Sequence, residues 1–145
     1  MFEHCDPPKA RMIRAMSYDI TTMQVIQSQY RTVQPYITKD GSEIRELMHP
    51  NVHGNRQQSL AEATVAPGAQ TALHLHRATE EIYHFTQGTG VMRLGAETFA
   101  VAAGDTVAIP PATPHCVRNT GDEPLKILCA CSPAYCHDDT FLLAP

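Results

Sequence analysis

Apolar and polar residues alternate in short segments from about residue 59 onward. In TALHLH, residues 71–76, two leucines alternate with His74 and His76, so on a strand the leucines and the histidines lie on opposite faces. Further segments of strand length, rich in β-branched or aromatic residues, occur at 59–66, 81–87, 90–94, 97–103, 106–110, 115–119 and 125–131. No segment carries helical periodicity over a comparable length, so the pattern predicts an all-β domain.

Glycine and proline separate these segments. All eight glycines and eight of the eleven prolines lie after residue 40, and they mark turns between the predicted strands. Strands at such short and regular spacing are typical of an all-β sandwich or barrel, and there is neither an internal repeat nor a linker. Residues 40–145 are therefore predicted to form a single barrel domain.

The first 39 residues differ in character, because they contain no glycine and show no strong hydrophobic period. The polar start with Pro7 and Pro8 offers no face to a core, so the first fifteen or so residues are predicted to be a disordered leader. One or two loose strands are suggested further on by Val25, Ile26, Tyr30, Val33 and Tyr36. We expect residues 1–39 to supply this leader and strands that form a sheet edge, a dimer arm, or both.

Composition narrows the class of protein. Eleven Lys and Arg against 15 Asp and Glu give a formal charge of −4, which argues against a broad basic surface for a nucleic acid. No apolar run approaches the roughly 20 residues that span a bilayer, and the N-terminus lacks the apolar core of a signal peptide. The five cysteines form no C-x-x-C pair and fit reduced thiols; Cys129 and Cys131 would share one strand face and pack as small apolar residues. A cytoplasmic protein without nucleic-acid or membrane partners is expected.

Histidine supplies the candidate chemistry. His74 and His76 project from one strand face, where two adjacent imidazoles are costly to bury without a compensating partner. A divalent metal is such a partner, and Glu81 on the next predicted strand and His115 after the segment PPATP would complete four ligands. Three neutral imidazoles and one carboxylate suit Fe, Mn, Ni, Zn or Co. The alternative for the histidine pair alone is a polar, solvated strand face.

The spacing of these residues resembles that of the cupin superfamily. The run from Gly68 through His74, His76 and Glu81 to Gly88 is similar to the first cupin motif, G-x5-H-x-H-x(3,4)-E-x6-G. The second motif, G-x5-P-x-G-x2-H-x3-N, is matched by Gly104, Pro110, Ala112, His115 and Asn119. Nine of the ten defining positions agree, and the departure is Ala112 in place of glycine, which is strained if its φ is positive.

The resemblance implies a double-stranded β-helix, or jelly-roll barrel, with one divalent metal near its centre. It implies that His74, His76, Glu81 and His115 are the ligands and that Asn119 is structural. It also implies a homodimer that exchanges an N-terminal strand.

Glu80 is the rival to Glu81 as the acidic ligand, since the family pattern also allows the shorter gap. We favour Glu81, because it keeps six residues before Gly88 and shares strand parity with Tyr83. His84 has the opposite parity, so we expect it to face away from the metal and to lie at a subunit or sheet-packing face.

Parity also selects the residues predicted to line the cavity beside the metal. Gln70 and Ala72 share the face of the paired histidines, Tyr83 and Phe85 share that of Glu81, and Val117 shares that of His115. Arg93 either reaches into the cavity to bind an anion or lies on the outer face. For each of these residues the alternative is packing in the core or at the surface.

Four protein ligands leave one or two coordination positions open, which is the mark of a catalytic and not a structural metal site. The sequence therefore predicts a metal-dependent enzyme acting on a small oxygenated molecule, with dioxygenase chemistry first and isomerase or decarboxylase chemistry next. The alternatives are a module that binds a small molecule without turning it over, and a metal that only stabilises the barrel.

Overall fold

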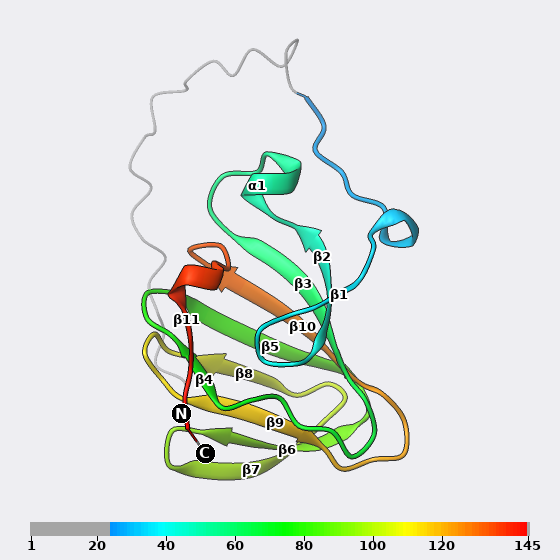
Figure 1. The fold of residues 1–145 in the computed structure, drawn as a ribbon. Coiled ribbons are helices and arrows are strands. Elements are labelled where there is room, and N and C mark those ends of the chain that lie inside the picture. The colour runs from blue at the N-terminus through cyan, green and yellow to red at the C-terminus, as the bar shows by residue number, and fades with distance from the viewer. Residues whose placement is uncertain (1–23, 145) are drawn as a thin grey trace, which may run out of the picture.

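The computed structural model describes residues 24–144, which form two antiparallel β-sheets facing each other (Figure 1). The six-stranded sheet has the order β1 (Tyr36–Ile37), β2 (Glu43–Met48), β3 (Ser59–Val65), β10 (Leu125–Ser132), β5 (Glu80–Gln87) and β8 (Thr106–Ile109). The five-stranded sheet has the order β11 (Thr140–Leu142), β4 (His74–His76), β9 (His115–Asn119), β6 (Thr89–Leu94) and β7 (Glu97–Ala102). This is the predicted all-β jelly-roll barrel.

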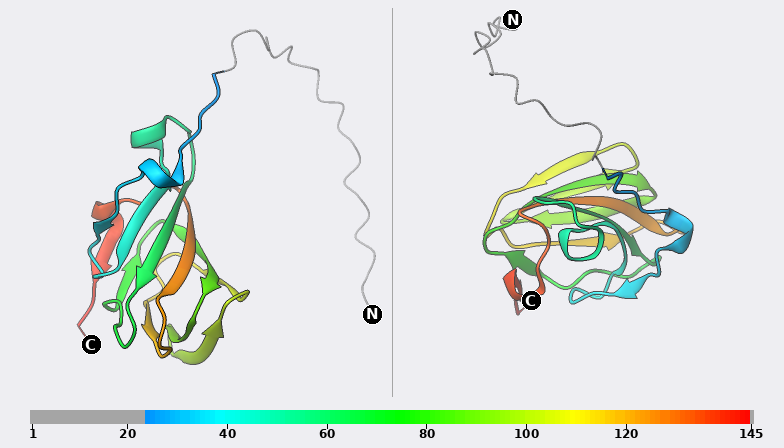
Figure 2. Two further views of the ribbon diagram at one scale, coloured as in Figure 1. Left: turned by 90° about the vertical axis from the view of Figure 1, so that its right-hand side faces the viewer. Right: turned by 90° about the horizontal axis from the view of Figure 1, so that it is seen from above.

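In residues 24–144, three single-turn helices lie outside the sheets: η2 (Tyr30–Thr32), α1 (Pro50–His53) and η3 (His137–Asp139). The segment with η2 and β1 runs along β2 at the edge of the six-stranded sheet (Figure 2). The prediction of one or two loose strands in residues 25–36 is thus correct only in part. The strand found there, β1, covers only Tyr36 and Ile37. The predicted disordered leader lies outside the described residues. None of the described helices is long and apolar enough to cross a bilayer.

Alternation of side chains between the two faces of each strand builds the core. Along β10 and β5 every second residue is buried, as expected for strands with one face inside the barrel. The largest wholly buried side chains include Phe85, Met92, Leu125 and Ile127, which pack together between the sheets. This apolar core fills one part of the barrel and leaves the polar side chains of β4 and β9 at its margin.

Residues of the cupin-like motifs stabilise two turns. Gly88, between β5 and β6, has φ of 84°, and a Cβ there would lie 3.0 Å from the carbonyl oxygen of Pro124, so both conformation and space require glycine. Asn119 is structural, as expected: its side-chain amide donates to the carbonyl oxygens of Val65 and Glu123, and its oxygen accepts from the N–H of Gly121.

Candidate metal centre

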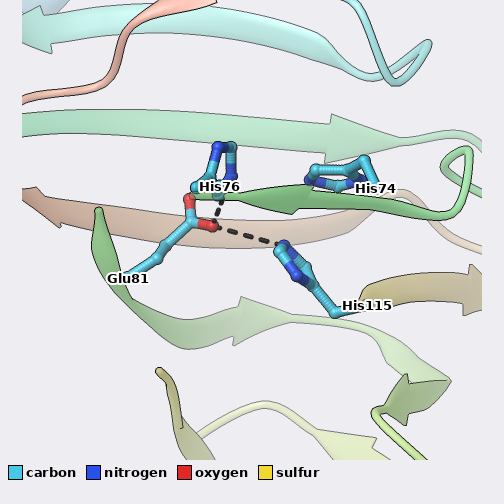
Figure 3. Close-up of side chains that lie close together, drawn as sticks. All are labelled: His74, His76, Glu81 and His115. Atoms are coloured by element: carbon cyan, nitrogen blue, oxygen red, sulfur yellow. Dashed lines mark ion pairs between the residues drawn. The ribbon is translucent and has the colours of Figure 1, made fainter. Parts of the chain in front are cut away.

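The four side chains predicted as ligands converge inside the barrel (Figure 3). His74 and His76 come from β4, Glu81 from β5 and His115 from β9. One nitrogen or oxygen atom from each lies within 4.8 Å of the corresponding atoms of the other three. All four are buried, with exposed fractions of 4% or less. Glu81 is therefore the inward carboxylate, whereas Glu80 is exposed on the opposite face.

Local structure fixes how the strands present these side chains. His74 pairs directly with His115 across β4 and β9, so their side chains leave neighbouring strands on the same face. The turn between β4 and β5 is held by Asp139, whose carboxylate accepts the backbone N–H groups of Ala78 and Thr79 at 3.0–3.1 Å. These contacts set the spacing between His76 and Glu81.

Hydrogen bonds determine which ring nitrogen of each histidine carries its proton. Nδ1 of His74 lies 2.8 Å from the carbonyl oxygen of Ala72, and Nδ1 of His115 lies 2.9 Å from that of Thr113. A carbonyl oxygen can only accept, so both Nδ1 atoms donate. Nδ1 of His76 lies 3.1 Å from Oγ1 of Thr140, whose own proton is donated to the carbonyl oxygen of Cys136. In their neutral form all three rings thus carry the proton on Nδ1 and keep a lone pair on Nε2.

The Nε2 atoms of His76 and His115 face the carboxylate of Glu81. Oε2 of Glu81 lies 3.1 Å from Nε2 of His76 and 3.4 Å from Nε2 of His115 (Figure 3). Among the described residues, neither Oε2 of Glu81 nor Nε2 of His115 has a hydrogen-bond partner. Lone pairs that face one another without a shared proton repel, and a cation between them removes the repulsion. Ligands about 2.1 Å from one ion are separated by about 3.0–3.4 Å in octahedral or tetrahedral geometry, so the donor set fits a metal.

Charge states agree with this donor set. Burial opposes ionisation of Glu81, but hydrogen bonds and positive charge from His115 and His76, present when a proton sits on Nε2, outweigh burial and lower its pKa to about 2. A metal ion in the place of that proton would act in the same direction. Burial, and after it the neighbouring His115, lowers the pKa of His74, which keeps that imidazole neutral as a metal ligand must be. On the other carboxylate oxygen, Oε1 of Glu81, the thiol of Cys131 donates a hydrogen bond at 3.4 Å. Burial raises the pKa of Cys131, so the thiol keeps this proton.

His74, His76 and Glu81 border a cavity of about 50 Å³, and His115 lies beside them without lining it. A cavity of this size holds a few water molecules or a ligand of a few heavy atoms. Its lining includes Asp40, whose carboxylate lies 3.9 Å from Nε2 of His74, together with Glu46, Tyr36 and Tyr135. No Lys or Arg of residues 24–144 lines it. An ion held by the four side chains would therefore meet a small space whose ionisable lining groups include carboxyl groups but no Lys or Arg.

Comparison with known proteins agrees with this architecture. The cupin domain family matches residues 61–131, which include strands of both sheets and all four converging side chains. The chain belongs to the cupin family. Uncharacterized protein MJ1618 of Methanocaldococcus jannaschii is 53% identical over 122 residues, which cover 84% of this cupin and 98% of that protein.

Two similar proteins are named after oxalate decarboxylase. Oxalate decarboxylase OxdC of Bacillus subtilis is 34% identical over 100 residues, which cover 66% of this cupin but only 26% of OxdC. The crystal structure of a predicted oxalate decarboxylase from Thermotoga maritima has a TM-score of 0.65 at 23% identity, covering 76% of this chain and 99% of that one. At that identity the likeness establishes the shared fold alone.

Six residues were named as candidates to line the cavity, five of them by parity, and of these only Tyr83 lines it. Phe85 and Val117 belong to the apolar core instead. Gln70 and Ala72 are exposed, because β4 is regular only over residues 74–76 and strand parity does not extend before it. Arg93 lies on the outer face, where its Nε donates to the carbonyl oxygen of Gly95. His84 faces away from the cluster, as predicted, and contacts Thr106.

Several residues at the site were not found from the sequence. Thr140 and Asp139 act from the C-terminal tail, and Asp40 and Glu46 come from the edge of the six-stranded sheet. Cys131 was predicted to pack as a small apolar residue, yet it also contacts Glu81. Ala112 has φ of 59°, so alanine is strained where the motif has glycine. Its N–H nevertheless donates to the carbonyl oxygen of His76.

Proposed function

We propose that this cupin is an enzyme that uses one divalent metal, bound by His74, His76, Glu81 and His115, to act on a small oxygenated molecule. The observation that carries the proposal is the convergence of three imidazoles and an ionised carboxylate beside a cavity that His74, His76 and Glu81 line. Four protein ligands leave coordination positions that face the cavity, where a substrate can chelate the ion. The metal, when bound, would supply Lewis acidity or, if it is iron, a centre for dioxygen chemistry.

Dioxygenase chemistry on a neutral chelating substrate is the reaction we place first. The cavity wall contains the carboxyl groups of Asp40, Glu46 and Glu81, and no Lys or Arg of the described residues lines it. A dianionic substrate would therefore meet carboxylates with only the metal to balance its charge. A small diketone, enediol or hydroxyketone carries chelating oxygens without that penalty.

A decarboxylase acting on a small carboxylic acid is the second candidate. It is supported by the 34% identity to oxalate decarboxylase OxdC over 100 residues. The chain spans only about a quarter of OxdC, so the activity named for the whole of that protein is a proposal here.

The two reactions separate in one assay. Protein loaded with Fe(II) or Mn(II) is given acetylacetone, a neutral chelating diketone, or oxalate, a chelating dianion. Oxygen consumption with acetylacetone, absent in His115→Ala, supports the dioxygenase. Carbon dioxide release from oxalate without net oxygen consumption supports the decarboxylase. Tight binding of either compound without turnover by any loaded form contradicts the enzyme and supports a binding module.

We also propose a homodimer and a cytoplasmic location. Leu60, Ala130 and Ile82 lie side by side across β3, β10 and β5 on the outer face of the six-stranded sheet, and the two larger side chains are 37% and 40% exposed. An apolar row of this kind suits a second copy of the chain. The four described cysteines are free thiols, which fits a reducing compartment. Sedimentation at several protein concentrations tests the dimer.

A further inference from the structure

The wall of the cavity away from β4 contains a carboxyl group that the metal does not need. Glu46 lines the cavity together with Tyr36 and Tyr135. The same three residues line a groove on the outer side, which is also bordered by His49 and Arg56. They therefore form the boundary between the metal cavity and the surface, and we call them the neck residues.

The strand register explains why Glu46 points inward. Ile44, two residues earlier on β2, packs against the core, so Glu46 has the inward parity. Across the sheet Glu46 is paired with Ala61, which is paired with Cys129. Ala61 is small, so space remains in front of the carboxyl group. A register shift directly after Glu46 ends the regular pairing of β2 with β3.

The side chain of Glu46 is half-buried, and one oxygen of its carboxyl group, Oε1, is buried without a fixed partner among the described residues. Its Oε1 has no hydrogen-bond partner among residues 24–144, and no described Lys or Arg forms an ion pair with Glu46. Burial raises the pKa of Glu46, and the nearby His49 lowers it in part. The other titratable groups that feel its charge are Tyr36 on β1 and Cys131 on β10. Burial, then the charge of Glu46, raises the pKa of Tyr36 to about 12, so Tyr36 remains a neutral phenol.

We propose that Glu46 is the acid–base residue of the cavity, which accepts a proton from a hydroxyl group of the bound substrate and passes it to solvent through the neck. The inference rests on the proposed function, because the substrate must be held by the metal. In the step, the O–H bond of the substrate breaks and an O–H bond forms on the Glu46 carboxylate, leaving the substrate oxygen anionic. Glu46 then gives the proton to water in the outer groove, and the reverse sequence returns a proton to a product. No oxidant or reductant is consumed.

This role narrows the class of substrate. The molecule would carry a chelating oxygen next to an acidic hydroxyl group, as in a hydroxamate, an enediol or an α-hydroxyketone. It would be neutral before binding, since the carboxyl groups of Asp40 and Glu46 disfavour an anion. With a cavity of about 50 Å³, it would have only a few heavy atoms on the metal side of the neck.

Proton release on binding of acetohydroxamic acid tests the role directly. This small neutral chelator loses its hydroxyl proton when it binds a divalent ion. Isothermal titration calorimetry of zinc-loaded protein, in buffers of different ionisation enthalpy from about pH 5 to about pH 8, counts the protons released per ligand bound. The variants are Glu46→Gln, Glu46→Asp and, as a matched control, Glu43→Gln at an exposed position of the same strand.

In wild-type protein and Glu43→Gln, Glu46 should take up the proton that the ligand loses. The release to solvent should therefore fall well below one proton in the pH range where Glu46 is ionised in the ligand-free protein but protonated in the complex. In Glu46→Gln, release should stay at about one proton across the range, and Glu46→Asp should restore part of the pH dependence. Identical curves for wild type and Glu46→Gln, with zinc bound to both, would overturn the role of Glu46 alone. Failure of zinc-loaded wild type to bind the chelator would overturn the proposed function, and this inference with it.

Discussion

The three converging histidines of this cupin and a fourth, His49, are all buried but differ in their hydrogen bonds. His74, His76 and His115 engage Nδ1 in hydrogen bonds, and Nε2 of His76 and His115 faces Glu81. His49, at the start of α1, uses both nitrogens: Nδ1 accepts the N–H of Asn51, and Nε2 donates to the carbonyl oxygen of Tyr135. The comparison teaches that burial alone does not identify a ligand. A buried histidine is a candidate ligand when its hydrogen bonds leave one nitrogen without a partner.

Removing one of the histidines proposed as metal ligands should have the largest effect on metal affinity. We expect His76→Ala and His115→Ala to fold and to lose stoichiometric metal, with affinity lowered by more than about 100-fold, because each removes one of four ligands. Elemental analysis after dialysis measures the metal, and circular dichroism confirms the fold. Full metal occupancy in both variants would show that the ligand assignment is wrong.

Removing the hydrogen-bond acceptor of a ligand histidine should have the next largest effect on metal affinity. Thr140→Val keeps the shape of the side chain but removes the oxygen that accepts from Nδ1 of His76. Metal affinity should fall by about 10- to 100-fold, since such partners orient the ligand. Thr106→Val is the matched control, because it removes the same contact from the exposed His84. Equal metal affinity in the two variants would contradict the positioning role of Thr140.

Removing His49 should change the stability of the protein and not its metal content. His49→Ala deletes the cap on the N–H of Asn51 and the bond to Tyr135. We expect the free energy of unfolding to fall by about 1–2 kcal/mol, with one metal still bound per chain. Urea denaturation and elemental analysis are the measurements. Loss of the metal in a folded His49→Ala protein would erase the distinction between that histidine and the three converging ones.

The smallest effect should come from the strained turn that contacts His76. Ala112→Gly relieves a left-handed alanine, worth about 1–2 kcal/mol, but makes the unfolded chain more flexible, at about 0.4–1 kcal/mol. The free energy of unfolding should rise by a few tenths to about 1 kcal/mol, as thermal unfolding would show. A clear decrease would mean that the methyl group of Ala112 stabilises the turn.

Much of the barrel follows from the sequence because local alternation decides it. The eight segments identified as strands correspond to β3 through β10, and parity correctly separates Glu81 from Glu80 and directs His84 outward. Parity fails where the strand stops, which is why Gln70 and Ala72 were misplaced. β2 was missed because its apolar residues do not alternate, since Glu46 takes an inward position and the register shifts after it.

The contacts between distant parts of the chain could not be predicted in this way. Thr140 reaches His76 over 64 residues of sequence, and Asp139 reaches Thr79 over 60. Both depend on the pairing of β11 with β4, which no local pattern in the tail specifies. The motif therefore predicts the four converging side chains, while the side chains that orient them and the neck residues require the fold.

Elemental analysis of untagged protein, purified without chelators or a nickel column, tests the central claim most directly. The account predicts about one divalent transition metal per chain, either as purified or after incubation with a single ion. Iron would support the dioxygenase reaction, whereas manganese or zinc would favour the decarboxylase, isomerase or binding roles. No metal after incubation with Fe, Mn, Ni, Zn or Co would contradict the claim that the three Nε2 atoms and Glu81 form a metal site.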